Sequence, residues 1–341
     1  MEQTFVRNGW YAAGWSEDIT RAPLERWIAG APLVFYRKQD GSPVALDGTC
    51  PHRAYPLALG RVKGDDLECG YHGITYGCDG ACVRVPGEGR APSALRVNAY
   101  PLVERGGLIW IWMGDPARAN ASDIVERWLA DPGWVSVHGT KMFDCRASLL
   151  IENLLDLSHE AFLHPETIGN DAVAETPIVT ETLPNGVRAT RKMLGIPPPP
   201  LFAKFGLSGK VDRQQIAEFW APGLCLTRAT LTPHTPGEVT QNFVVVHCVT
   251  PETATRTRYS WAVARDYAKD DIIASQGWLH GASAIFDQDV AALAAQEARM
   301  QLLPPDHREL SVHGDAAALA TRKLMRELLR AENAGRTPVP A

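Results

Sequence analysis

Residues 152–164 read Glu-Asn-Leu-Leu-Asp-Leu-Ser-His-Glu-Ala-Phe-Leu-His. The apolar residues of this stretch recur near the helical period, which predicts one helix over about residues 148–164. Pro165 predicts the end of that helix, because the residue before a proline is pushed out of the α region. Polar groups on an apolar helix face are costly unless something binds them. Four such residues interrupt this apolar stripe: Asn153, Asp156, His159 and His164.

These polar residues favour a metal site on one side of the helix. At 100° per residue, Asn153, Asp156 and His164 fall within about 80° of one another, and His159 lies about 60° beyond Asp156. Two imidazoles beside carboxylates indicate a first-row metal, because the 2-His-1-carboxylate arrangement with open positions is typical of non-heme Fe(II). Two core histidines that donate to backbone carbonyls are the alternative interpretation.

Composition and charge exclude several classes of protein. The chain has 341 residues, of which 45% are hydrophobic and 21% charged, which is typical of a globular protein with room for two domains. A net charge of -5 and a pI near 6.1 argue against nucleic acid or an anionic membrane as the main partner. The chain starts without an apolar signal segment, contains no apolar run long enough to span a bilayer, and has seven cysteines, an odd number. We therefore expect a cytoplasmic location.

The first third of the chain reads as short strands separated by Gly and Pro, which predicts an all-β unit over residues 1–118. Two of its loops each pair one Cys with one His: Cys50-Pro51-His52-Arg53 and Cys69-Gly70-Tyr71-His72-Gly73. Two Cys and two His could hold a structural zinc ion. They could also hold a Rieske [2Fe–2S] cluster, in which two Cys bind one iron and two His bind the other.

The two loops resemble the Rieske signature of ring-hydroxylating and demethylating oxygenases. The resemblance covers Cys-Pro-His-Arg, Cys-x-Tyr-His-Gly and the sixteen residues that separate His52 from Cys69. It implies that Cys50, His52, Cys69 and His72 bind a [2Fe–2S] cluster. Residues 119–341 would then form the catalytic domain.

The Glu-Asn-x-x-Asp-x-x-His-x-x-x-x-His pattern of residues 152–164 is similar to the mononuclear iron motif of the same family. The resemblance implies that His159 and His164 bind the iron and that Asn153 lies near it. Asp156 would couple the iron to a Rieske histidine of a neighbouring subunit. In this family the two centres of one subunit are too far apart for useful electron transfer, so the resemblance implies a head-to-tail ring, a homotrimer.

From about residue 172 the pattern predicts mainly strands. Asn185-Gly186 between two apolar runs is a strong hairpin signal. Further runs at 216–220, 224–231, 239–249 and 256–264 extend an antiparallel sheet. We therefore expect an α+β fold, with the all-β Rieske domain followed by an antiparallel sheet flanked by helices in a helix-grip-like arrangement. Pro197–Pro200 cannot be a central strand, and it could be a lid at the active site or a surface linker.

The acidic iron ligand is expected on a helix near residues 283–296, which contains Asp287 and Asp289. With Ile285 at zero, Asp289 falls near 40°, within the apolar stripe, and Asp287 near 200°, on the exposed side. A carboxylate in the apolar stripe needs a compensating cation. Asp289 is therefore the predicted ligand. The family usually has Glu just before this Asp, whereas this chain has Gln288.

The strand around His247 is similar to a segment of the vanillate and dicamba demethylase branch, in which this histidine faces the substrate. A buried core histidine is the alternative. We expect His280 to contact the substrate as well, and His234 and Trp278 are further, weaker candidates. The resemblance implies an oxygenase that receives NAD(P)H-derived electrons from a separate reductase or ferredoxin and uses O₂ to demethylate a small methoxy-aromatic acid.

Two other interpretations of the function remain open at this point. N-demethylation, or hydroxylation of a ring or methyl carbon, would use the same iron. A non-catalytic electron-transfer protein or a zinc-stabilised binding protein would need only the first motif. The second constellation of Asp156, His159, His164 and Asp289 argues for the enzyme.

Overall fold

The computed structural model describes residues 4–304 and 306–334, and these form two compact units. One unit contains residues 5–125 together with residues 250–253. The other contains residue 4, residues 126–249 and the described part of the chain from residue 254 onward. Each unit has its own buried core.

The first unit is built from three small antiparallel sheets and contains both Cys/His loops. The sheet orders are β1-β10-β9, β2-β3-β4 and β5-β6-β7-β8. One loop follows β4, and the other lies between β6 and β7. The strands are β1 (Trp10–Trp15), β2 (Leu24–Ile28), β3 (Ala31–Arg37), β4 (Pro43–Asp47), β5 (Arg61–Lys63), β6 (Asp66–Glu68), β7 (Thr75–Tyr76), β8 (Cys82–Arg84), β9 (Leu102–Arg105) and β10 (Leu108–Trp112). The predicted all-β unit is confirmed.

The second unit contains one seven-stranded antiparallel sheet with the order β11-β17-β16-β15-β14-β13-β12. After β11, the strands follow the chain order from β12 to β17, so that β17 pairs with β11. The strands are β11 (Val135–Phe143), β12 (Val179–Leu183), β13 (Gly186–Ile196), β14 (Val211–Trp220), β15 (Leu224–Pro233), β16 (Gln241–Thr253) and β17 (Arg256–Arg265).

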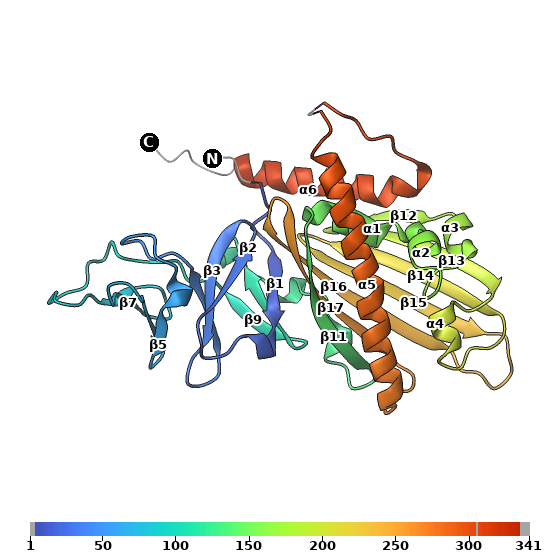
Figure 1. The fold of residues 1–341 in the computed structure, drawn as a ribbon, viewed down its shortest axis with the longest axis horizontal. Coiled ribbons are helices and arrows are strands. Elements are labelled where there is room, and N and C mark those ends of the chain that lie inside the picture. Colours follow the sequence, from blue (N-terminus) through green and yellow to red (C-terminus); the bar gives the residue numbers. More distant parts are fainter. Residues whose placement is uncertain (1–3, 305, 335–341) are drawn as a thin grey trace. The chain divides into compact units, whose positions relative to one another are not determined.

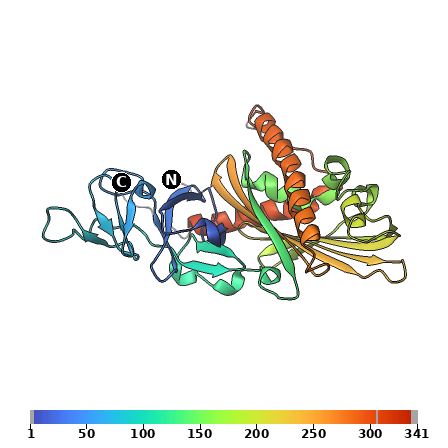
Figure 2. The same ribbon diagram turned by 60° about the horizontal axis from the view of Figure 1, so that its bottom comes forward.

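Helices lie against this sheet, and the long helix α5 crosses one of its faces (Figures 1 and 2). Phe286 of α5 packs on Tyr259 and Trp261 of β17, with ring centroids 5.2 and 5.1 Å apart. The core of this unit therefore lies between the sheet and α5. The helices are α1 (Ala147–Leu155), α2 (Glu160–Leu163), α3 (Asp171–Glu175), α4 (Pro200–Ala203), α5 (Ile272–Met300) and α6 (Ala316–Ala334). The α+β fold class is confirmed.

The predicted hairpin at Asn185-Gly186 is also confirmed, because Leu183 at the end of β12 pairs with Gly186 at the start of β13. The strand β11 was not predicted. It contains Ser136, His138 and Lys141, and most of its side chains are only partly buried. The apolar alternation that marks the other strands is therefore weak in this segment.

The prediction of one continuous helix over residues 148–164 is wrong. α1 ends at Leu155, and Asp156 has an extended backbone with φ -98° and ψ 91°. Its carboxylate accepts a hydrogen bond from the Ser158 N–H, at 3.0 Å, and so caps a 3₁₀ turn, η6 (Leu157–His159), which leads into α2. An Asp side chain competes well for backbone N–H groups, which explains why the helix breaks there.

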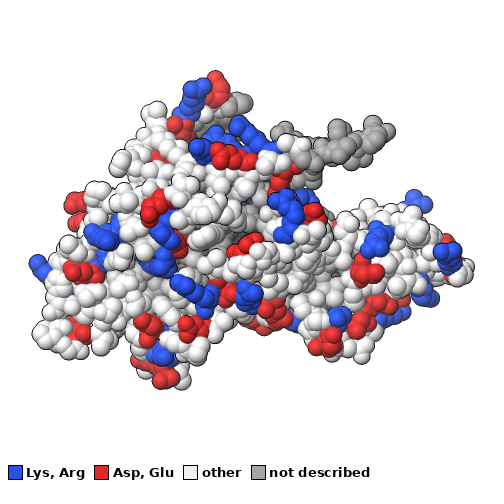
Figure 3. Space-filling model, turned by 180° about the vertical axis from the view of Figure 1, so that it is seen from behind, with Lys and Arg blue, Asp and Glu red and all other residues white. Residues whose placement is uncertain are grey.

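The surface carries both signs of charge. On the face shown in Figure 3, Lys and Arg are interspersed with Asp and Glu, and neither sign forms a continuous field. The helices of residues 4–304 and 306–334 include none that is long and apolar enough to cross a membrane.

Candidate metal centres and active site

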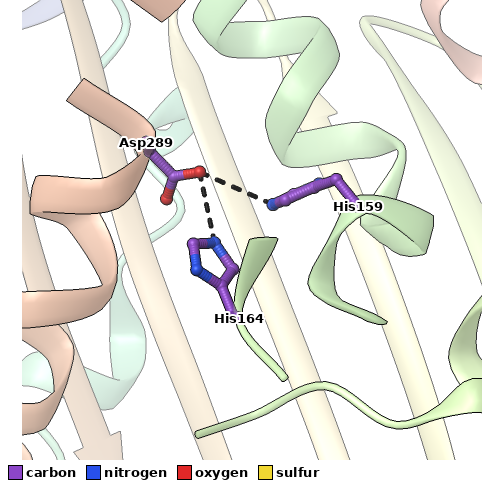
Figure 4. Close-up of side chains that lie close together, drawn as sticks. All are labelled: His159, His164 and Asp289. Atoms are coloured by element: carbon purple, nitrogen blue, oxygen red, sulfur yellow. Dashed lines mark hydrogen bonds and ion pairs between the residues drawn. The ribbon is translucent and has the colours of Figure 1, made fainter. Parts of the chain in front are cut away.

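His159, His164 and Asp289 meet in the second unit, and their side chains point toward one another (Figure 4). Their ligand atoms all lie within 4.8 Å of one another. The Asp289 Oδ1 atom is 3.2 Å from His164 Nε2 and 3.6 Å from His159 Nε2. Two imidazole nitrogens and a carboxylate oxygen that converge in this way fit a first-row divalent metal with open positions.

The other ring nitrogen of each histidine is held by a hydrogen bond. His159 Nδ1 lies 2.7 Å from the backbone oxygen of Asp156, and His164 Nδ1 lies 2.7 Å from Gln288 Oε1. Both partners are acceptors, so each Nδ1 carries the proton and each Nε2 presents a lone pair to the centre. Metal-binding histidines in proteins are normally oriented in this way.

The break in the helix at Asp156 makes this arrangement possible. The backbone carbonyl of Asp156 accepts from His159 because η6 turns the chain directly after it. The side chain of Asp156 points elsewhere: it caps η6 and also lies 3.4 Å from Arg191 Nη2. It is 27% exposed, so it lies at the edge of the site and not in its centre.

Asp289 comes from the middle of α5, and the helical-phase prediction is confirmed. The Asp289 side chain is 5% exposed, whereas that of Asp287 is 63% exposed and pairs with Lys141 at 2.7 Å. Asn153 Nδ2 lies 3.3 Å from Asp289 Oδ1. The Asn153 Oδ1 atom is buried and has no hydrogen-bond partner among the described residues, which fits a further polar group in the centre.

The electrostatics also fit a cation. Burial lowers the pKa of His164, but the hydrogen bond and charge of Asp289 outweigh burial, so the net shift of this pKa is upward. The site therefore stabilises a positive charge next to the Asp289 carboxylate, where the His164 ring lies. A metal ion supplies that charge and leaves the histidines neutral, which is the state in which they bind metals.

A buried ion pair lies beside the two histidines. Glu160 follows His159 directly and is 3% exposed, and its carboxylate accepts from Arg213 Nη2 at 3.2 Å and from Gln215 Nε2 at 2.8 Å. Both partners come from β14, so this pair fastens α2 to the sheet. Sequence reasoning did not find Glu160 or Arg213. The sequence feature that could have indicated this ion pair is the charged Glu between two predicted metal ligands.

A cavity opens beside the His159, His164 and Asp289 cluster. It contains about 580 Å³ of space free of protein atoms, counting the part open to solvent. Its lining is mainly apolar, which suits an aromatic molecule. The apolar lining residues include Leu154, Leu157, Phe243, Val245, Val263, Ile285 and Phe286.

His247 lines this cavity, and His280 does not. His247 is 3% exposed, and it contacts Tyr259 and Thr227. His280 is exposed, and its Nδ1 lies 2.8 Å from the Gln276 backbone oxygen. The structure thus gives His280 no part in the cavity, because it lies on the outer side of α5. Trp278, two residues earlier, lines the cavity instead.

The two Cys/His loops of the first unit form a second cluster. Cys50 and Cys69 are 1% and 2% exposed, and the rings of His52 and His72 have centroids 4.7 Å apart. Both histidines are exposed at the surface. The Tyr76 hydroxyl lies 3.1 Å from Cys50 Sγ, and backbone N–H groups of Tyr71 and His72 donate to Cys69 Sγ. Two buried thiols with N–H donors beside two exposed imidazoles fit a Rieske cluster better than a closed zinc site.

Two protein-family models match separate parts of the chain. Residues 9–101 match the model of the Rieske [2Fe-2S] domain. Residues 143–331 match the model of the vanillate O-demethylase oxygenase C-terminal domain. The second match covers more than half of the chain and includes the whole His/Asp cluster.

Individual relatives match over nearly their whole length. A putative toluene-4-sulfonate monooxygenase system iron-sulfur subunit of Comamonas testosteroni is 37% identical, with 98% of this chain and 99% of the relative covered. A vanillate O-demethylase oxygenase subunit of a Pseudomonas species is 32% identical, with 96% of each covered. Among solved structures, dicamba monooxygenase bound to 3,6-dichlorosalicylic acid superimposes with a TM-score of 0.90 at 33% identity, covering 98% of this chain and all of that one.

These matches and the two clusters agree on the cofactors as well as the fold. A Rieske domain supplies a [2Fe–2S] cluster, and the catalytic domain is that of a non-heme iron enzyme. The chain belongs to the Rieske non-heme iron oxygenases of the vanillate O-demethylase type, which are the oxygenase components of multicomponent O-demethylating and N-dealkylating systems.

Proposed function

We propose that this protein demethylates a methoxy-aromatic acid of the vanillate type and releases formaldehyde. O₂ is the co-substrate, and the electrons come from NAD(P)H through a separate reductase or ferredoxin. The observation that carries the proposal is the cluster of His159, His164 and Asp289, the last two of them buried, which opens onto an apolar cavity. The methoxy-aromatic acids vanillate and dicamba appear in the names of its relatives, which supports this substrate class.

The proposal gives each residue of the cluster a role. His159 Nε2, His164 Nε2 and Asp289 would hold Fe(II), and Asn153 would hold the Asp289 carboxylate in place through its amide. The Asp156 carbonyl and Gln288 would fix the proton of each imidazole on Nδ1. When bound, the iron supplies the open positions at which O₂ is reduced. In the first unit, Cys50, His52, Cys69 and His72 would hold the [2Fe–2S] cluster.

The cavity walls would place the methyl group and exclude bulk water. An apolar wall of Phe243, Ile285 and Phe286 leaves the ring few orientations, so the C–H bond nearest the cluster is the one attacked. The aryl methyl ether, O₂, two electrons and two protons give an aryl hemiacetal and water. The hemiacetal then breaks its carbon–oxygen bond to the ring oxygen, which yields a phenol and formaldehyde.

We also propose a homotrimer in which one subunit's Rieske cluster delivers electrons to the next subunit's iron. Asp156 would be the connecting residue, since its side chain is partly exposed and its backbone oxygen already contacts His159. Arg191, 5% exposed, would hold the Asp156 carboxylate in position.

A formaldehyde assay tests the reaction. Iron-replete protein is supplied with a surrogate reductase, NADH, O₂ and a panel of methoxy- and N-methyl-aromatic compounds. Formaldehyde formed in proportion to NADH from methoxy-aromatic acids is the expected result. Formaldehyde only from N-methyl compounds, or hydroxylated product without formaldehyde, would contradict the proposed reaction.

Mixed oligomers test the trimer. Cys69→Ser would remove the cluster and Asp289→Ala the mononuclear iron, so each variant alone is expected to be inactive. Co-expressed in one cell, they form mixed rings in which an intact cluster faces an intact iron site. Recovered activity in the mixture supports transfer between subunits. If native mass spectrometry shows mixed trimers that are inactive, the electrons do not cross the subunit boundary.

A further inference from the structure

His159 and His164 belong to one short stretch of chain, residues 159–169, named the histidine loop. Figure 4 shows both imidazoles pointing toward Asp289, which faces them from α5. Within the loop, α2 is only four residues long, and a helix of this length does not hold its shape by itself. Contacts from outside the loop must therefore help to set the positions of the two imidazoles.

The chain after His164 turns back onto the start of α2. The N–H groups of Thr167 and Gly169 both donate to the His164 backbone oxygen, each at 3.1 Å. A Cβ atom at position 169 would collide with the Glu160 backbone oxygen, so glycine is required for this close approach. Glu160 and Gly169, on either side of His164 in sequence, are therefore neighbours in space.

Arg213 of β14 reaches both ends of the histidine loop. Its Nη2 atom donates to the Glu160 carboxylate at 3.2 Å, and its Nη1 atom donates to the Ile168 backbone oxygen at 3.2 Å. Gln215, two residues along the same strand, donates to the other Glu160 carboxylate oxygen at 2.8 Å. The Arg213 and Glu160 side chains are 1% and 4% exposed. One buried guanidinium thus ties the start and the end of the loop to the sheet.

We propose that Arg213 is a positioning residue for the mononuclear iron, because it holds His159 and His164 as one unit opposite Asp289. This inference rests on the proposed function, since it takes these three residues as the metal ligands. Arg213 touches none of them directly and acts through the histidine loop.

The contacts of Arg213 assign it to the loop rather than to a substrate. Arg213 is the one arginine that lines the cavity among the described residues, so a substrate anion is the other group that it could bind. Both of its terminal nitrogens are already used, one by Glu160 and one by the Ile168 carbonyl. The Glu160 carboxylate also neutralises its charge. A fork of two donors at fixed spacing suits this double contact, which a lysine cannot make.

A double replacement separates positioning from stability. Removing one partner of a buried ion pair leaves an uncompensated charge and is strongly destabilising, whereas replacing both by apolar residues is often neutral for stability. Glu160→Leu/Arg213→Met should therefore restore most of the melting temperature that Arg213→Met loses. It does not restore the bond to the Ile168 carbonyl, so the two histidines should remain misplaced.

Metal binding measures this misplacement without turnover. The Fe(II) affinity of the full chain is measured by anaerobic competition with a chelator, while the Rieske absorption shows that the cluster is intact. We expect Arg213→Met and the double variant to bind Fe(II) about 10–100-fold more weakly than the wild type. Arg213→Lys keeps the charge and loses one contact, so it should lose about threefold to tenfold, the equivalent of one hydrogen bond.

The spectrum of the bound iron is a second readout. The electron paramagnetic resonance spectrum of the Fe(II)–nitric oxide adduct depends on the arrangement of the ligands, and the oxidised Rieske cluster does not contribute to it. We expect this spectrum to change in Arg213→Lys and in the double variant. A variant that loses only stability should keep the wild-type spectrum.

Glu218 offers a matched control on the same strand. It is 3% exposed and pairs with Arg188 at 2.6 Å and Arg228 at 2.9 Å. It lies five residues after Arg213, and therefore on the opposite face of the sheet. Glu218→Gln should lower the melting temperature and leave the Fe(II) affinity within about twofold of the wild type.

Two results would overturn the proposal. One is a double variant that regains both the stability and the Fe(II) affinity of the wild type, because the ion pair would then act on stability alone. The other is wild-type affinity and spectrum in Arg213→Lys. A wild type that binds Fe(II) no more tightly than Asp289→Ala would instead overturn the proposed iron site, and this inference with it.

Discussion

The two metal-binding clusters are built in opposite ways. The first unit takes its two Cys and two His from loops within residues 50–72, and both of its histidines are exposed. The catalytic cluster joins His164 to Asp289 across 125 residues of sequence, and both are buried. A cluster that exchanges electrons with a partner benefits from exposed ligands. A centre that reacts with O₂ and a C–H bond benefits from an apolar cavity that excludes water.

The two clusters also depend on different parts of the structure. The first depends on backbone geometry within two loops, where N–H groups of Tyr71 and His72 reach the Cys69 sulfur. The second depends on packing between α5 and the turn after α1. Helix α5 contributes Gln288 to it, and α1 contributes Asn153. A substitution in one cluster should therefore leave the other intact. Substitutions in either cluster test that independence.

The largest expected effect is that of Cys69→Ser. Loss of a thiolate ligand should bleach the Rieske absorption and stop electron uptake, so product formation should fall below measurable turnover. The mononuclear iron should remain bound, because its cluster lies in the other unit. Iron analysis and visible absorption measure both outcomes. Cys78→Ser is the matched control, and its cluster spectrum should be that of the wild type. Loss of both metals from Cys69→Ser would show that the two clusters are not independent of each other.

Asp289→Ala should give the reciprocal result. Without its carboxylate ligand the catalytic cluster should lose its iron, and turnover should fall at least about 1,000-fold, while the Rieske absorption remains. Asp287→Ala, two residues earlier on the exposed side of α5, is the control and should keep both iron and activity. Retained product formation in Asp289→Ala would show that another residue is the acidic ligand.

A smaller effect is expected for Gln288→Leu. Removing the acceptor of His164 Nδ1 lets the imidazole rotate and change tautomer, so iron affinity should weaken about 10–100-fold. Competition with a chelator measures this affinity independently of turnover. Gln288→Glu should restore it, since a carboxylate accepts the same bond. Gln301→Leu, at the end of the same helix, should have no effect. Unchanged affinity in Gln288→Leu would mean that packing alone orients His164.

The smallest expected effect is in the first unit. Burial, followed by the neighbouring Cys50, keeps the pKa of Tyr76 well above its usual value, so its hydroxyl is a donor to the Cys50 sulfur. Such a bond stabilises the more negative, reduced cluster. Tyr76→Phe should therefore lower the reduction potential by roughly 20–60 mV, the equivalent of one hydrogen bond. Protein-film voltammetry measures it. Tyr36→Phe, which loses a contact to Cys78, should leave the potential unchanged.

Much of the molecule could be predicted from local patterns. Cys-x-His and Cys-x-x-His each bring their two side chains together within one loop, so the first cluster needs no knowledge of the fold. The burial of Asp289 followed from its phase on a regular helix, which is a local property. The same reasoning failed for residues 148–164. The Asp156 side chain accepts a hydrogen bond from the Ser158 N–H and so ends the helix, whereas the calculation at 100° per residue assumed that the helix continued.

Other features depend on which strands lie side by side. The sequence by itself determined the fold class, the two motifs and the side of α5 that carries the acid. Only the tertiary structure decided that Tyr259, His247 and Thr227 form one chain across β17, β16 and β15, and that Glu160 finds Arg213 on β14. Of the weaker pocket candidates, it places Trp278 in the cavity lining and His280 outside it. The physical reason is that strand order and register place these groups together, and both arise from long-range pairing rather than from neighbouring residues.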